Sequence, residues 1–155
     1  MRKTAVIVFA VLFLTVFLPL TASAKPLDEI QEYTITVDVR DDGTMDIKYH
    51  IVWKVLDSTA EGPLEWVKIG IPNKYVDTIA ALSDNIKDIS YYSEGGDFVR
   101  IDFNKSYNAD EVLDIDFSIH QSYMYKINYS DSTVSYRFTP GWFEEINVNA
   151  IKILW

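Results

Sequence analysis

The sequence predicts an all-β protein, an antiparallel β-sandwich of the immunoglobulin-like or jelly-roll-like kind with about eight or nine strands. Three observations predict this fold. Apolar and polar residues alternate along several segments, turn signals recur about every 8 to 14 residues, and no long segment has a convincing helical period. The sandwich is expected to be one domain, residues 25–155, preceded by a signal peptide at residues 1–24.

The first 24 residues have the three parts of a signal peptide. Arg2 and Lys3 are basic, residues 5–20 are uncharged and largely apolar, and Ala22-Ser23-Ala24 has the small-x-small form of a cleavage site. An uncleaved anchor is the alternative, but the apolar run is shorter than the roughly 20 residues that cross a bilayer. We therefore expect cleavage before Lys25, a secreted or extracytoplasmic location in a bacterial cell envelope, and no stable membrane insertion after cleavage.

The clearest strand pattern runs from Tyr33 to Val55. Apolar residues alternate with polar ones on both sides of the turn signal Asp41-Asp42-Gly43. The glycine suits the left-handed position of a three-residue hairpin loop. This stretch therefore predicts a long hairpin with one buried and one solvated face.

The middle of the chain predicts several shorter strands. Pro63 and Pro72 bound one strand whose inward residues are Val67, Ile69 and Ile71. Residues 75–89 fit either an amphipathic helix or two short strands with a turn at Asp84-Asn85, and we favour the strands. Residues 90–93 and 98–103 flank Gly95-Gly96, which predicts a second hairpin.

The last third of the chain continues the strand pattern. Residues 113–119 alternate strictly, residues 128–132 form a turn, and residues 134–138 form the next strand. After the Pro140-Gly141 turn the apolar phase shifts by one residue at Ala150, as at a β-bulge. This pattern predicts that the terminal Trp155 points into the core.

Composition excludes some kinds of chemistry. The chain has no cysteine, which excludes thiol catalysis, disulfides and cysteine-bound zinc. Its net charge of -9, more negative still once Arg2 and Lys3 are removed, repels nucleic acid and anionic lipid. A cation or a basic partner remains compatible with that charge.

No motif predicts catalysis. His50 and His120 fall on outer strand faces without metal-ligand spacing, and the 23 acidic residues are scattered over turns and outer faces. The acidic turns at Asp41-Asp42 and Glu144-Glu145 could hold calcium, but turn solvation explains them as well. We expect a protein that is not an enzyme, with no cofactor and no metal site.

Aromatic residues form the candidate ligand-binding set. Adjacent residues in a strand point to opposite faces, so neighbouring aromatic residues leave at least one ring of each pair available for a ligand. The alternative is that both faces are covered, within the domain or by a larger assembly. The candidate residues are Tyr91, Tyr92, Tyr123, Tyr125, Trp142 and Phe143.

Three segments carry a family resemblance: "YTITVDVRDDGTMDIKYHIVWKV", "GPLEWVKIGIPN" and "FTPGWF". With them, residues 30–155 resemble a group of uncharacterised exported bacterial proteins, and distantly the extracytoplasmic β-sandwich of unknown function in predicted bacterial membrane proteins. The resemblance implies a β-sandwich and no particular catalytic or binding residue. Proteins of that kind often continue into a linker, tail or membrane anchor, so surface attachment stays open.

Three functions follow from these patterns. The first is a non-catalytic binding or interaction module that recognises a glycan or protein at the cell surface through exposed aromatic residues. The second is a structural spacer domain of a bacterial envelope protein. The third, which the composition favours least, is a carboxylate-dependent hydrolase.

Overall fold

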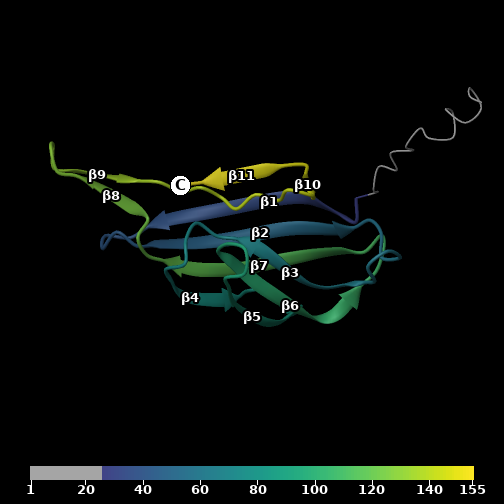
Figure 1. The fold of residues 1–155 in the computed structure, drawn as a ribbon. Coiled ribbons are helices and arrows are strands. Elements are labelled where there is room, and N and C mark those ends of the chain that lie inside the picture. Colours follow the sequence, from purple (N-terminus) through teal and green to yellow (C-terminus); the bar gives the residue numbers. More distant parts are fainter. Residues whose placement is uncertain (1–25) are drawn as a thin grey trace, which may run out of the picture.

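The computed structural model describes residues 26–155, and these residues form eleven strands and no helix (Figure 1). The all-β sandwich predicted from the sequence is confirmed, whereas the signal peptide lies outside the described residues. No helix in residues 26–155 is long and apolar enough to span a membrane. The strands are β1 (Asp28–Val39), β2 (Met45–Val55), β3 (Leu64–Gly70), β4 (Val76–Ala81), β5 (Ile86–Tyr92), β6 (Phe98–Tyr107), β7 (Val112–Gln121), β8 (Tyr125–Asn128), β9 (Thr133–Tyr136), β10 (Asn147–Val148) and β11 (Ile151–Leu154).

Two sheets of unequal width form the sandwich. The larger has the order β10-β1-β2-β7-β4 with β11 also paired to β1, and the smaller has the order β3-β6-β5. Most pairs are antiparallel, but β10 and β11 both run parallel to β1. The larger sheet is therefore mixed at one edge, a feature that strand patterns alone do not predict.

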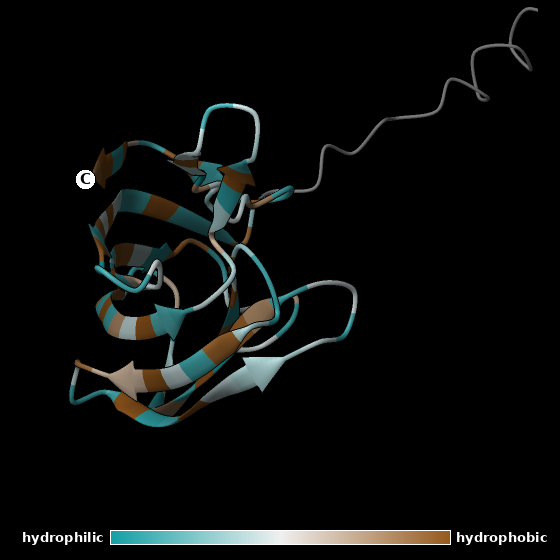
Figure 2. Cartoon of the chain, turned by 90° about the vertical axis from the view of Figure 1, so that its left-hand side faces the viewer, coloured by the Kyte–Doolittle hydropathy of each residue, from teal (hydrophilic) through white to brown (hydrophobic). Residues whose placement is uncertain are grey.

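The core lies between the two sheets. Alternate residues of β1, β2 and β7 meet those of β3 and β6 in one buried cluster. Figure 2 shows the resulting alternation of hydrophobic and hydrophilic residues along the strands. Tyr49 stacks on Phe117 with ring centroids 4.5 Å apart, which joins β2 to β7 within the core.

The β1–β2 hairpin forms as the sequence predicts. Gly43 has a φ of 86°, and the Arg40 N–H donates to the Thr44 carbonyl at 2.9 Å. The Asp42 carboxylate accepts hydrogen bonds from the backbone N–H and the hydroxyl of Thr44 at 3.0 and 2.6 Å. The acidic turn is thus closed by its own side chain.

Residues 75–89 form two strands, as favoured above, but in different sheets. β4 pairs with β7 in the larger sheet and β5 with β6 in the smaller one. The connecting turn is tied to β7, because the Ser83 hydroxyl accepts from the Asp116 N–H at 2.6 Å and Asn85 donates to the Asp114 carbonyl at 3.0 Å. This turn carries the chain from one layer to the other.

The phase shift predicted near Ala150 matches an irregularity in β1. Gln31 is the extra residue in the pairing of β1 with β2, so the buried residues of β1 step from Ile30 to Tyr33. The parallel strands repeat this step, since Ile30 lies opposite Val148 and Tyr33 opposite Ile151. The break between β10 and β11 therefore keeps the C-terminal segment in register with the bulged edge of β1.

The prediction that Trp155 points into the core is wrong. Trp155 is 65% exposed and packs edge-to-face on Phe138, with centroids 6.3 Å apart. Every residue of β11 is exposed. The three-stranded sheet is too narrow to cover the outer edge of the larger one, so an apolar pattern at this edge does not produce burial.

The β8–β9 hairpin extends beyond the end of the larger sheet (Figure 1). All eight of its strand residues are exposed, including Tyr125, Ile127, Val134 and Tyr136. Its turn at residues 129–132 agrees with the predicted one. A two-stranded ribbon of this kind gains little stability from burial.

Candidate ligand groove between the sheets

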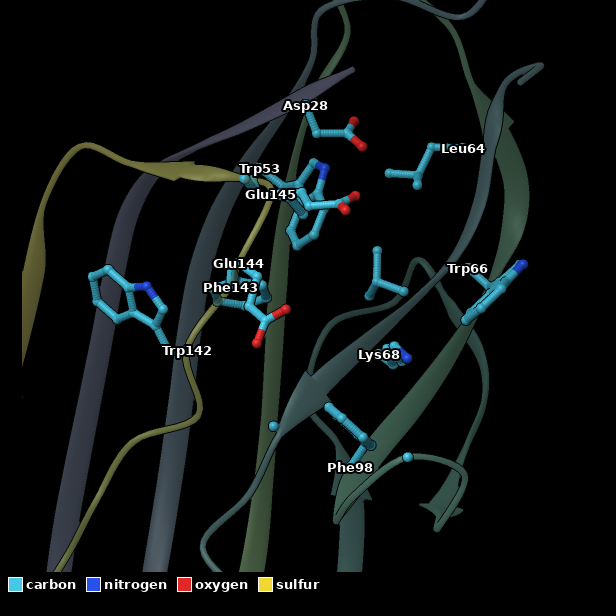
Figure 3. Close-up of a pocket in the computed structure, with 14 residues that line it drawn as sticks. Asp28, Trp53, Leu64, Trp66, Lys68, Phe98, Trp142, Phe143, Glu144 and Glu145 are labelled. Atoms are coloured by element: carbon cyan, nitrogen blue, oxygen red, sulfur yellow. The ribbon is translucent and has the colours of Figure 1, made fainter. Parts of the chain in front are cut away.

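A groove of about 590 Å³ opens along the free edge of β3, opposite residues 142–146 (Figure 3). We call it the β3 groove. Its walls come from the start of β1, the whole length of β3, the end of β2, the β5–β6 hairpin and the segment that precedes β10. The residues that line it are Asp28, Trp53, Leu64, Trp66, Val67, Lys68, Gly70, Gly95, Phe98, Trp142, Phe143, Glu144, Glu145 and Ile146.

Phe143 fixes one wall of the groove. Its ring packs edge-on against Tyr33 and Trp53, with centroid distances of 5.8 and 5.9 Å. Tyr33 and Trp53 belong to the core and are almost fully buried. Phe143 therefore closes the open side of the sandwich and anchors the segment that carries its neighbours.

Trp142 has the opposite orientation. It is 66% exposed and projects from the segment on the side away from β3, at the rim of the groove (Figure 3). Alternation of side chains along an extended segment explains why one ring is inside and the next outside. Of the adjacent pair singled out from the sequence, Phe143 is a packing residue and Trp142 presents a free ring.

Three carboxylates face the groove. Figure 3 shows Glu144 and Glu145 pointing from their segment into the space before β3, and Asp28 at the upper end. The pKa of Asp28 is raised from its ordinary value, chiefly because its carboxyl group is withdrawn from solvent. The Trp53 indole N–H opposes this pKa shift, and the charge of Glu61 adds to it. The groove is an acidic environment.

Trp66 forms the other aromatic border. Its outward position follows from the pattern of β3, in which Val67 and Ile69 are buried. The Arg100 guanidinium lies 4.5 Å from the centroid of its ring and is itself held by Asp102 at 2.7 Å. Trp66 is 43% exposed, so the indole is positioned by a cation but remains open to solvent.

Tyr123 and Tyr125 lie at a different place, next to the β8–β9 hairpin. Tyr123 is 70% exposed, has a φ of 58° and packs against Tyr75 with centroids 4.4 Å apart. The Tyr125 ring lies against Gly43, where an added Cβ would be 3.2 Å from two ring atoms. Tyr125 thus rests on the β1–β2 turn, and both tyrosines border a separate hollow of about 430 Å³.

Tyr91 and Tyr92 end β5 at the edge of the smaller sheet. The Tyr91 hydroxyl donates to Asp97 at 2.5 Å, and the Tyr92 hydroxyl donates to Glu94. These hydrogen bonds are the main reason why the pKa of each phenol is raised. The two side chains are thereby joined to their own hairpin turn.

The six candidate residues therefore occupy three places. Among residues 26–155, no ring-to-ring contact joins one of the three pairs to another. Only Trp142 and Phe143 line the β3 groove. The structure thus offers a groove with aromatic borders in place of a single continuous aromatic platform.

The two histidines lie on the outer face of the larger sheet, as the alternation predicts. Each contacts an aspartate directly across the β2–β7 pair: His50 Nδ1 lies 2.8 Å from Asp116 and His120 Nδ1 lies 2.6 Å from Asp46. Four register positions, about 13 Å of strand, separate the two pairs. The histidines do not converge, and residues 26–155 contain no group of three His, Asp or Glu that could hold a metal ion.

Trp66 and Asp28 line the β3 groove but are not among the candidate residues predicted from the sequence. The inward alternation of Val67 and Ile69 already places Trp66 on the wet face, which was a usable signal. Asp28 had no such signal, because its position depends on where Trp53 and the segment before β10 lie.

Comparison with known proteins identifies no family. No family model matches the chain, and no curated protein matches it. Two solved structures of M1 zinc metallopeptidase E323A mutants align with 63% and 64% of the chain at 9% identity. The first is described as a two-domain enzyme with L-tryptophan bound, and the second, from Deinococcus radiodurans, has a Tyr-Ser-Ala substrate bound. The match spans 21% of either metallopeptidase chain, and the TM-score of 0.43 is too low to carry an argument.

Proposed function

We propose that this protein is an extracytoplasmic, non-catalytic module that binds a cell-surface or extracellular ligand, glycan or protein, at the β3 groove. The proposal includes export through a signal peptide that is cleaved before Lys25, and kinship with the exported bacterial β-sandwich proteins named above. N-terminal sequencing of the exported protein tests the cleavage site.

One observation carries the proposal. Trp142 is 66% exposed at the rim of the groove while the next residue, Phe143, is packed on Tyr33 and Trp53. The fold thus holds a large ring in solvent on a segment that is fixed to the core. A fixed, exposed indole at the rim of a groove that is lined by carboxylates suits the binding of a sugar ring or a peptide.

A binding screen with two matched variants tests the proposal. The protein is presented to glycan and peptide arrays, and Trp142→Ala is expected to weaken binding at least tenfold without loss of folding. Trp155→Ala is the control, because Trp155 is equally exposed at 65% but lies outside the groove. Blank arrays, or equal effects of the two substitutions, would contradict the proposal, and turnover abolished by one Asp or Glu substitution would replace it with the hydrolase.

A further inference from the structure

The free edge of β3 is the most unusual part of the groove. β3 is the outermost strand of the smaller sheet, and it pairs only with β6. Among the described residues, no backbone hydrogen bond links residues 64–70 to residues 142–146 across the groove. Open strand edges are usually blocked or covered, because their free N–H and C=O groups pair readily with another chain.

The edge is bordered by negative charge along its length. A second hollow of about 280 Å³ continues from the β3 groove around the start of β3 and shares Asp28, Leu64 and Trp66 with it. Lys68 is the only lysine or arginine among the described residues that line either hollow. The carboxylates that line them are Asp28, Asp57, Glu61, Glu65, Glu144 and Glu145.

A buried donor also faces the groove. Trp53 is 3% exposed, and its indole N–H meets the Asp28 carboxylate and lowers the pKa of that group. Figure 3 shows this nitrogen turned toward Asp28 at the upper end of the groove. This contact holds the Asp28 carboxylate at the upper end of the groove.

We propose that the β3 groove binds an extended basic peptide segment, which adds as a strand to the free edge of β3 and places lysine or arginine side chains among these carboxylates. This inference rests on the proposed function and names the class of its ligand. The incoming backbone supplies the partners that the β3 edge lacks. Alternate side chains of the peptide point to opposite sides, so every second residue meets the acidic wall.

The same observations favour a peptide over a glycan. A sugar stacks on an exposed indole and bonds to carboxylates, but it has no repeating N–H and C=O groups to pair with a strand edge. A neutral ligand would also leave the negative charge of the groove unmatched. An extended cationic chain matches both the free strand edge and the carboxylates.

Fluorescence anisotropy with labelled eight-residue peptides tests the inference. The probe alternates lysine with valine, a second peptide has glutamate in place of lysine, and a third carries N-methyl groups on alternate amides of the lysine peptide. We expect binding of the first peptide only, because the second is repelled and the third cannot complete the strand ladder. The affinity of the first peptide is expected to fall as salt is raised.

Variants of the groove complete the test. The double substitution Glu144→Gln with Glu145→Gln is expected to weaken the lysine peptide about fivefold. Asp110→Asn with Asp41→Asn, two exposed carboxylates outside the groove, is the matched control.

The outcomes separate this inference from the proposed function. Equal binding of the glutamate or N-methylated peptide overturns the strand-addition inference. So does pairing of two copies of this chain through β3, seen as a dimer in light scattering. If a glycan binds in a Trp142-dependent manner while the lysine peptide does not, the proposed function stands and this inference fails. If none of the peptides or glycans binds, both the proposed function and this inference fail.

Discussion

Gly70 and Gly141 meet backbone to backbone where the smaller sheet touches the segment that leads to β10. A Cβ added to Gly141 would lie 2.3 Å from the Gly70 carbonyl oxygen, and one added to Gly70 would lie 2.9 Å from the Gly141 Cα. No side chain fits between them. This contact brings residues 142–146 beside β3 and so fixes the width of the groove at one end.

Gly141→Ala is expected to lower the free energy of unfolding by about 2 kcal/mol, because the methyl group forces the two backbones apart. Urea denaturation measures this change. Gly62→Ala is the control, since Gly62 has a φ of 87° but no atom within 4 Å of an added Cβ, so only backbone strain of about 1 kcal/mol is expected. A Gly141→Ala cost no larger than the control would refute the close-approach explanation.

Phe143→Ala is expected to cost about 3 kcal/mol in unfolding free energy, because it removes the ring that packs on Tyr33 and Trp53. Trp142→Ala should change it by less than about 0.5 kcal/mol, since that ring is in solvent. Thermal denaturation of the two neighbouring variants gives the comparison. Similar losses in both would mean that Trp142 is a packing residue as well.

Quenching of tryptophan fluorescence should separate the four indoles. Trp142 and Trp155 are 66% and 65% exposed, Trp66 is 43% exposed and Trp53 is 3% exposed. With acrylamide as the quencher, Trp142→Phe and Trp155→Phe should each remove a strongly quenched component, and Trp53→Phe should remove an unquenched one. If all four indoles resist acrylamide, the proposal of a free ring at the groove fails.

Tyr33→Phe is expected to leave the unfolding free energy unchanged or to raise it by up to about 1 kcal/mol. The Tyr33 hydroxyl is buried and has no hydrogen-bond partner within residues 26–155, and this burial raises the pKa of the phenol. Tyr107→Phe is the matched control, because Asn85 donates to the buried Tyr107 hydroxyl at 3.1 Å, so its loss should cost about 1 kcal/mol. Chemical denaturation measures the unfolding free energy of both variants. A larger loss of unfolding free energy in Tyr33→Phe than in Tyr107→Phe would show that the Tyr33 hydroxyl contributes to stability.

Asp46→Asn should make stability less dependent on acid pH. Hydrogen bonds from His120 and then from Arg40 hold the pKa of Asp46 below its ordinary value of 3.8. A lowered pKa in the folded state gives stability that is present above the unfolded pKa and is lost as pH falls through the folded pKa. Melting temperatures from pH 6 down to pH 3 should therefore fall less steeply in this variant.

Asp114→Asn is the control for this pH series, because Asp114 is an exposed carboxylate on the same face of the larger sheet. It should retain the pH dependence of the unmodified protein. Parallel curves for Asp46→Asn and the unmodified protein would show that the Asp46 contacts do not contribute to acid stability.

The alternation of residue types determined much of this structure without help from tertiary contacts. It predicted the β1–β2 hairpin, the turns at Gly43 and Gly95-Gly96, the inward faces of β3 and β7, and the phase shift near Ala150. These features are local, because a strand repeats every two residues and a left-handed turn position selects glycine.

Tertiary structure alone decided where those strands ended up. Trp155 has the same alternating pattern as buried strands but lies at an edge that the narrower sheet does not cover, so it is exposed. The sequence does not show which of the two adjacent rings, Trp142 or Phe143, is buried. The contact of Gly141 with Gly70 and the position of Trp53 direct Phe143 inward and Trp142 outward. Burial depends on what lies opposite a side chain, and that is set by the meeting of segments far apart in the sequence.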